Sequence, residues 1–169
     1  LAKSFTDVNI IAVSKTFPMS EILPVINSGH NHFGENKIQE AMEKWSDIKN
    51  DFPLIQLHMI GKLQTNKVKY AISIFDYIHS LDSLKLAEKI CKEEIKQKKK
   101  LKIFIQVNIG QESQKSGIQI DELRNFYEVC SKKLGLNIIG LMCLPPDNQD
   151  VKKYFSKISE LKNELNLKD

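Results

Sequence analysis

The chain has 169 residues, of which 41% are hydrophobic and 27% are charged, and its formal net charge is +4. This composition is typical of one ordinary globular domain with its own core, and no apolar run approaches the ~20 residues needed to span a bilayer. Arg124 is the only arginine among the basic residues, which argues against a protein that reads nucleic acid through arginine side chains.

Six short apolar or alternating runs predict β-strands, because each is bounded by turn residues. They occupy residues 9–13, 31–33, 54–60, 75–79, 102–109 and 137–142. Stretches with a period of 3.6 residues lie between these runs. An alternation of strands and helices implies a parallel sheet with helical crossovers, so the sequence predicts a single α/β domain.

Five helices are predicted in chain order. Ser20 is the expected N-cap of the first, which ends just before Gly29. Asp82 is the expected cap of the third, and Gly135 closes the fourth. Their apolar faces are Ile22, Leu23, Val25 and Ile26; Ile38, Ala41, Met42 and Trp45; Leu84, Ala87, Ile90, Cys91 and Ile95; Leu123, Phe126, Tyr127 and Cys130; and Val151, Tyr154, Phe155, Ile158, Leu161 and Leu165.

Two of the predicted strands carry polar residues on one face only. Gln56 and His58 alternate with apolar neighbours in one strand, and Gln106 and Asn108 do so in another. A parallel strand covered by helices on both faces is apolar on both, so this pattern favours a wall that faces a ligand cavity, as in a barrel. Six units are also enough for an open doubly wound sheet, whereas a complete (β/α)₈ barrel has eight units and typically ~250 residues.

The predicted strand ends indicate where chemistry could occur, since active sites of both architectures gather there. Lys15 follows the apolar run 10–14. A lysine amine at the edge of an apolar barrel is partly desolvated, which favours the neutral nucleophile that attacks an aldehyde. Position alone favours a lysine that only extends into water, because the chain contains many lysines. Asn36 could bind a ligand or cap a helix, and His58 could contact a cofactor ring or be a core histidine.

Six ordered segments resemble the pyridoxal phosphate homeostasis proteins. These segments are AVSKT at 12–16, FGENKIQE at 33–40, HMIGKLQTNK at 58–67, IHSLDS at 78–83, VNI at 107–109 with KSG at 115–117, and GLM at 140–142. The resemblance implies a (β/α)₈ barrel of the alanine racemase N-terminal type. It also implies that Lys15 holds pyridoxal 5'-phosphate (PLP) as a Schiff base, and that the cofactor pocket is lined by Asn36, His58, Ser80 and Met142.

The chain departs from the family pattern in two ways. Leu57 stands where the third segment of the family has tryptophan, and Lys62 stands where it has a second histidine. The family's N-terminal helix and its C-terminal phosphate-binding segment find no counterpart in residues 1–169. We therefore expect a single barrel domain over 1–169, truncated to about six βα units.

The resemblance implies a binding protein for intracellular vitamin B6 homeostasis, without established catalysis. The expected partners are PLP and PLP-dependent apoenzymes, and the expected state is a cytoplasmic monomer that binds no nucleic acid, membrane or metal. Isolated cysteines agree with the last point. One alternative is a PLP-dependent amino-acid racemase, for which the sequence offers no convincing second base. Another is a structural or interaction domain without a cofactor.

Overall fold

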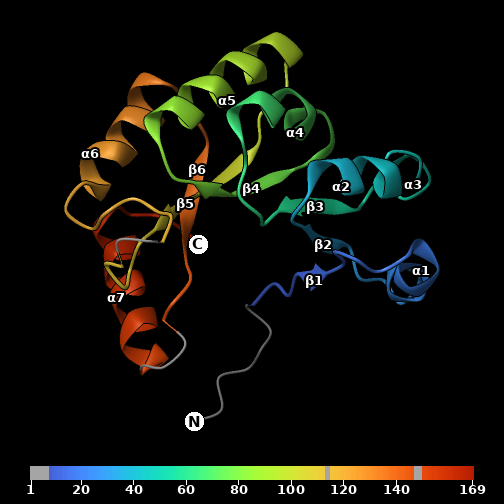
Figure 1. Cartoon of the computed structure of the whole chain (residues 1–169), viewed down its shortest axis with the longest axis horizontal. Helices are drawn as coiled ribbons and strands as arrows, with labels where there is room; N and C mark the ends of the chain where they lie inside the picture. The colour runs from blue at the N-terminus through green and yellow to red at the C-terminus, as the bar shows by residue number, and fades with distance from the viewer. Residues whose placement is uncertain (1–7, 113–114, 147–149) are drawn as a thin grey trace.

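The computed structural model describes residues 8–112, 115–146 and 150–169. Its six strands form one parallel sheet in the order β1-β2-β3-β4-β5-β6, so every strand pairs with the next strand in the chain (Figure 1). The strands are β1 (Ala12–Val13), β2 (His32–Glu35), β3 (Gln56–Met59), β4 (Tyr77–Leu81), β5 (Lys102–Val107) and β6 (Ile138–Cys143). This confirms the predicted parallel α/β architecture.

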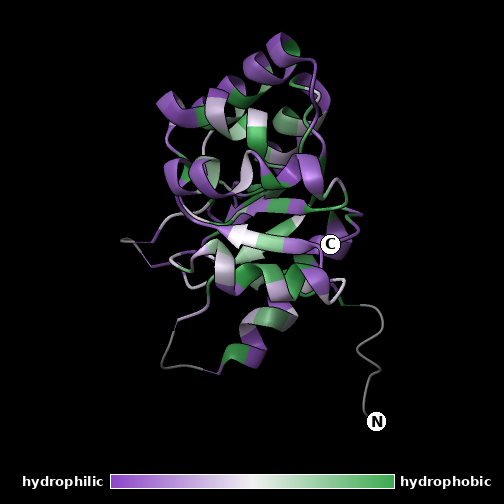
Figure 2. Cartoon of the chain, turned by 90° about the vertical axis from the view of Figure 1, so that its right-hand side faces the viewer, coloured by the Kyte–Doolittle hydropathy of each residue, from purple (hydrophilic) through white to green (hydrophobic). Residues whose placement is uncertain are grey.

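Helices connect the strands and follow the outer side of the curved sheet (Figure 1). They are α1 (Met19–Asn27), α2 (Ile38–Trp45), α3 (Ile48–Asp51), η2 (Thr65–Lys67), α4 (Val68–Ile74), α5 (Leu84–Gln97), α6 (Leu123–Glu128), η3 (Val129–Lys133) and α7 (Val151–Glu164). Hydrophobic residues concentrate where these helices meet the sheet, and hydrophilic residues cover their outer faces (Figure 2). The core therefore lies between the sheet and the helices.

The two faces of the sheet differ as the alternation predicted. Leu57 and Met59 of β3, and Ile103 and Ile105 of β5, are almost fully buried. The residues between them form the opposite face, where His58 meets side chains of the neighbouring strands. The sheet thus has an apolar side covered by helices and a partly polar inner wall.

The helix α4, with η2 before it, has no counterpart among the predicted helices. Val68, Ala71 and Ile72 are fully buried in it. The α-helical part has seven residues, which is too short to display a clear 3.6-residue repeat. Its apolar residues also run directly into those of the next strand.

The predicted helix caps were wrong, although the predicted glycine ends are confirmed. Helix α1 starts at Met19, after Pro18, so Ser20 lies inside the helix. Ser83, not Asp82, precedes α5, and no side chain caps that helix. Gly29 and Gly135 have φ angles of +93° and +62°, in the left-handed region that glycine adopts at helix ends.

The apolar face predicted for the third helix was partly wrong. Ile95 is 69% exposed, whereas Glu94 is 1% exposed. The Glu94 carboxylate accepts a hydrogen bond of 2.8 Å from the Leu101 backbone N–H and pairs with the Lys100 ammonium at 2.8 Å. A buried carboxylate is tolerated there because it satisfies the turn that leads into β5.

The predicted stripe of α7 is buried only near its end. Leu161 is buried within the helix and Leu165 directly after it. Val151 and Phe155 are 46% and 54% exposed. In Figure 1, α7 lies beside β6, and its last turn reaches α6, where Glu164 lies 3.8 Å from Arg124. Its first turns consequently have little described structure to pack against.

Candidate functional site

Lys15 lies in the turn that joins β1 to α1. The Phe17 N–H donates to the Ser14 carbonyl over 3.2 Å, and Thr16 has φ +69°, a left-handed conformation that non-glycine residues rarely adopt. Within the described structure the Lys15 side chain has no hydrogen bond or ion pair, and it is exposed. The expected desolvation was wrong for this chain, because β1 is an edge strand that pairs only with β2 among the described strands.

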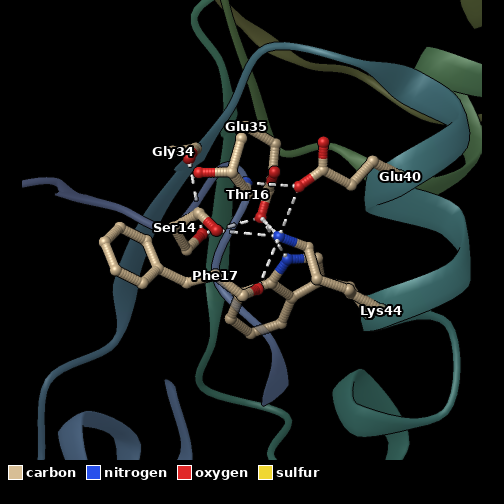
Figure 3. A network of polar contacts seen from close by, with 8 residues as sticks. Ser14, Thr16, Phe17, Gly34, Glu35, Glu40 and Lys44 are labelled. Carbon is tan, nitrogen blue, oxygen red and sulfur yellow. Dashed lines mark hydrogen bonds and ion pairs between the residues drawn. The ribbon is translucent and has the colours of Figure 1, made fainter. Parts of the chain in front are cut away.

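A buried carboxylate lies beside this turn (Figure 3). Glu35, at the end of β2, has no exposed surface. Its Oε1 accepts hydrogen bonds from Ser14 Oγ at 2.8 Å and Trp45 Nε1 at 3.0 Å, whereas its Oε2 has no protein partner. This contact joins the carboxyl ends of β1 and β2 to helix α2. The residue before Lys15 is thereby fixed in place.

Asn36 and Ser80, two of the predicted cofactor residues, each carry a buried polar atom without a partner. Asn36 Oδ1 and Ser80 Oγ are both enclosed, and neither forms a hydrogen bond in the described structure. An unsatisfied buried polar atom costs about 1–3 kcal/mol, so such atoms are rare outside sites that a ligand or an ordered water completes. These two atoms fit a polar ligand.

The backbone has an irregular feature near each of these two residues: a close contact at Asn36 and a register shift at Ser80. Gly61 packs against Asn36 so tightly that a Cβ at position 61 would meet the Asn36 carbonyl oxygen at 2.3 Å. The register between β4 and β5 shifts by one residue: Ile78 pairs with Ile103, but Leu81 pairs with Ile105. The extra residue falls beside Ser80 and breaks the strict alternation of faces, as bulges near functional sites often do.

His58, a third predicted residue, lies in a row of histidines along the inner wall. Its Nε2 is 2.9 Å from His32 Nδ1, and its Nδ1 is 2.9 Å from His79 Nε2. The His58 ring stacks on Tyr77 at 4.1 Å, and the His79 ring stacks on Phe104 at 4.3 Å. Both nitrogens of His58 are therefore occupied. Its contact with a cofactor stays a prediction.

The histidine row is neutral at ordinary pH. Burial lowers the pKa of His58 to about 3, with the nearby His79 and His32 as further causes, and burial lowers the pKa of His79 to about 4. Burial also lowers the pKa of His32. Each hydrogen bond then joins one N–H to one bare nitrogen. Sequence reasoning missed His32 and His79, although one histidine in each of three consecutive strands was a signal.

Met142 lies in a cavity of about 410 Å³ near the carboxyl ends of β3, β5 and β6. Gly61, Lys62 and Asn108 also line it. A second cavity of about 450 Å³ is lined by Asn36 and Lys62. The structure therefore places Met142 and Asn36 in neighbouring cavities that share Lys62, and it brings neither Lys15 nor Ser80 into either cavity.

The part of the chain that the structure describes shows no trio of histidine, cysteine or acidic side chains arranged to hold a metal ion. Its helices are also too short or too polar to cross a membrane. Cys130 is fully buried, and desolvation raises the pKa of its thiol to about 12. That cysteine is a core residue and not a nucleophile.

The sequence model of the "Alanine racemase, N-terminal domain" family matches residues 1–168. The pyridoxal phosphate homeostasis protein of Aquifex aeolicus is 38% identical over 159 residues, which cover 92% of this chain and 69% of that protein. The protein of the same name from Escherichia coli K12 is 33% identical over 154 residues, 90% of this chain and 66% of that protein.

Solved structures agree with these matches. PipY of Synechococcus elongatus PCC7942 without PLP superposes with a TM-score of 0.87 at 34% identity, covering 94% of this chain and 74% of that one. Its PLP-bound structure gives a TM-score of 0.81 at 31% identity, covering 95% and 77%. An alanine racemase of Clostridium difficile 630 gives a TM-score of 0.71 at 15% identity, covering 95% and 42%. The predicted alanine racemase-like fold is confirmed, here as an open six-stranded sheet.

Proposed function

The chain belongs to the pyridoxal phosphate homeostasis proteins, and from this membership we propose that it binds PLP covalently through Lys15 and serves intracellular vitamin B6 homeostasis. Asn36, His58, Ser80 and Met142 are the proposed cofactor-lining residues. The recipients are apoenzymes that use the same cofactor, and the working form is a cytoplasmic monomer.

The buried, unpartnered oxygens of Asn36 and Ser80 carry this proposal. Asn36 and Ser80 resemble Lys15 in position, because each residue lies at or near the carboxyl end of a parallel strand. Asn36 follows β2, Ser80 lies near the end of β4, and Lys15 follows β1. PLP presents a phenolic oxygen, an aldehyde and a phosphate, so an amide and a hydroxyl at this edge suit its polar groups. The residues present therefore fit the cofactor.

Bound PLP supplies an electrophilic aldehyde and an electron-withdrawing ring. The task of Lys15 is to offer a neutral amine to that aldehyde, which needs loss of one proton to water.

A carrier is preferred over a racemase because catalysis needs a base on each face of the substrate carbon. Both nitrogens of His58 already form hydrogen bonds, and its lowered pKa makes it a weak base. The relatives named above are also called homeostasis proteins and not enzymes. Incubation with L-alanine and PLP should therefore leave the optical rotation unchanged. Its sustained decay would contradict this preference.

The covalent link is tested by adding PLP, reducing with borohydride and mapping the modified lysine by mass spectrometry. We expect the cofactor mass on Lys15 and its loss in Lys15→Ala. Lys69→Ala, which removes an exposed lysine of α4, is the matched control and should leave the labelling unchanged. Labelling that is spread over surface lysines, or that survives Lys15→Ala, would reject the proposal.

A further inference from the structure

A second lysine, Lys44 of α2, contacts the turn that carries Lys15 (Figure 3). Its Nζ donates to the Ser14 carbonyl at 2.8 Å and to the Phe17 carbonyl at 3.3 Å. These carbonyls flank Lys15 on both sides. The ammonium therefore bridges the two ends of a four-residue segment, which limits how far the backbone between them can move.

Two carboxylates hold Lys44 in this position. Its Nζ is 2.8 Å from Glu35 Oε1 and 2.9 Å from Glu40 Oε1. The Glu40 oxygen also accepts the Thr16 N–H at 2.5 Å. The hydrogen bonds from Lys44 and Thr16 lower the pKa of Glu40. Both neighbours of Lys15 in the chain, Ser14 and Thr16, are thus tied to side chains of β2 and α2.

Lys44 and Lys15 differ in what their amines can do. The Lys44 side chain is 13% exposed and its ammonium faces four oxygen atoms. An amine enclosed by these oxygen atoms is not free to approach an aldehyde. Lys15 is exposed and, within the described structure, has no such partners. Lys44 is fixed by its contacts, whereas the Lys15 side chain is accessible.

We propose that Lys44 is a positioning residue for Lys15, a role that rests on the proposed capture of PLP by Lys15. Lys44 fixes the turn of residues 14–17, including the left-handed Thr16, so that the Lys15 amine leaves the strand end in one direction. Fixed orientation accelerates a reaction between two groups, and small displacements are costly. Without Lys44 the turn loses two carbonyl anchors, and Lys15 samples orientations that miss the aldehyde.

The test compares Lys44→Met with Lys49→Met. Lys49 is the matched control because its Nζ also holds one carbonyl, that of Ile74 at 3.0 Å, and one carboxylate, that of Asp76 at 2.6 Å, away from the turn. We expect Lys44→Met to slow covalent capture of PLP, followed by absorbance at fixed pH, by about tenfold or more. Lys49→Met should capture at the rate of the unaltered chain, and Lys44→Arg should restore part of the loss.

Hydrogen exchange of the Thr16 amide gives a readout that needs no cofactor. In Lys44→Met this amide should exchange faster, whereas Lys49→Met should leave it unchanged. If the unaltered chain captures no PLP, the proposed function fails, and the exchange still decides whether Lys44 anchors the turn. Unchanged capture or unchanged Thr16 exchange in Lys44→Met overturns the inference. If Lys44→Met does not fold, Glu40→Ala removes the Thr16 acceptor instead and must give the same two changes.

Discussion

The sheet contains two polar clusters that are built on opposite principles. At the carboxyl ends of β1 and β2, the charged cluster of Glu35, Glu40 and Lys44 holds an exposed turn. On the inner wall, the row of His32, His58 and His79 carries no charge and bonds mainly to itself. The charged cluster leaves Glu35 Oε2 unsatisfied, whereas the described hydrogen bonds use both nitrogens of the central histidine.

This difference separates a cluster that holds the Lys15 turn from a row whose hydrogen bonds link three neighbouring strands. A cluster beside the site can retain a buried unsatisfied atom, because the geometry of the turn is what it maintains. The histidine row on the inner wall holds no turn, and both nitrogens of its central residue, His58, pair with other histidines of the row. The two clusters should therefore respond differently to mutation, pH and cofactor.

The largest expected effect is that of Glu35→Ala. It leaves the Trp45 N–H without its acceptor and takes one of four oxygen atoms from the Lys44 ammonium, so the unfolding free energy should fall by about 2–4 kcal/mol. Urea denaturation measures this loss. Glu43→Ala, at an exposed position of the same helix, is the control and should change stability by less than about 0.5 kcal/mol. A loss below about 1 kcal/mol in Glu35→Ala would show that the charged cluster contributes little.

The histidine row should weaken in acid. The folded pKa values of His58 and His79 lie below their ordinary value of 6.5, so the folded state binds fewer protons than the unfolded state. Stability is complete above pH 6.5 and falls as the pH drops toward 4. Each histidine contributes up to about 1.4 kcal/mol per pH unit. From pH 7.5 to 5.5 the unfolding free energy should fall by roughly 2–3 kcal/mol.

The variant His79→Phe isolates this effect. It removes one of the two most shifted groups, so the loss between pH 7.5 and 5.5 should drop to about half. Urea denaturation at the two pH values provides the measurement. An equal pH dependence in His79→Phe and the unaltered chain would place the titrating groups elsewhere.

Gly61→Ala should disturb the strand end at Asn36. The new Cβ would lie 2.3 Å from a backbone oxygen, which cannot move as a side chain can. Overpacking of this kind costs about 1–3 kcal/mol, and the displaced Asn36 should weaken PLP binding. In Gly34→Ala the atoms nearest to the new Cβ are in the side chains of Ile11 and Ile60, at 3.1 Å, and these can shift. Greater damage from Gly34→Ala than from Gly61→Ala, measured by thermal unfolding, would contradict the close packing described above.

Ser80→Ala should have the smallest effect on stability. The Ser80 hydroxyl has no partner in the described structure, so its removal should leave unfolding free energy unchanged or raise it by up to about 1 kcal/mol. If the hydroxyl binds PLP, the dissociation constant should rise about five- to tenfold, as expected for one lost hydrogen bond. Fluorescence titration measures the affinity, with the exposed Ser73→Ala as control. A destabilised Ser80→Ala with unchanged affinity would assign Ser80 to the fold.

The sequence was sufficient for the features of the fold that depend on local repeats. Alternation placed Leu57 and Met59 on one face and His58 on the other, and the structure agrees. Periodicity did not predict that Glu94 is buried and Ile95 exposed. The burial of Glu94 depends on its hydrogen bond with the backbone N–H of Leu101, seven residues further along the chain. Periodicity ranks side chains by apolarity and does not anticipate a carboxylate that caps a distant turn.

Some residues of the candidate site were also predictable from the sequence, and others were not. The resemblance pointed to Asn36 and Ser80, and the structure finds an unpartnered oxygen on each. It did not point to Lys44, whose partners include backbone carbonyls that every residue type possesses. The His32 contact with His58 likewise depends on strand pairing, which a motif does not specify.

The consecutive strand order has a consequence for synthesis on the ribosome. Each strand pairs with the one made just before it, so the sheet can grow unit by unit as the chain emerges, with mostly short-range contacts at each step. The turn bearing Lys15 needs only residues up to Trp45 for its anchoring. The nascent protein can therefore assemble this turn long before the histidine row is complete at His79.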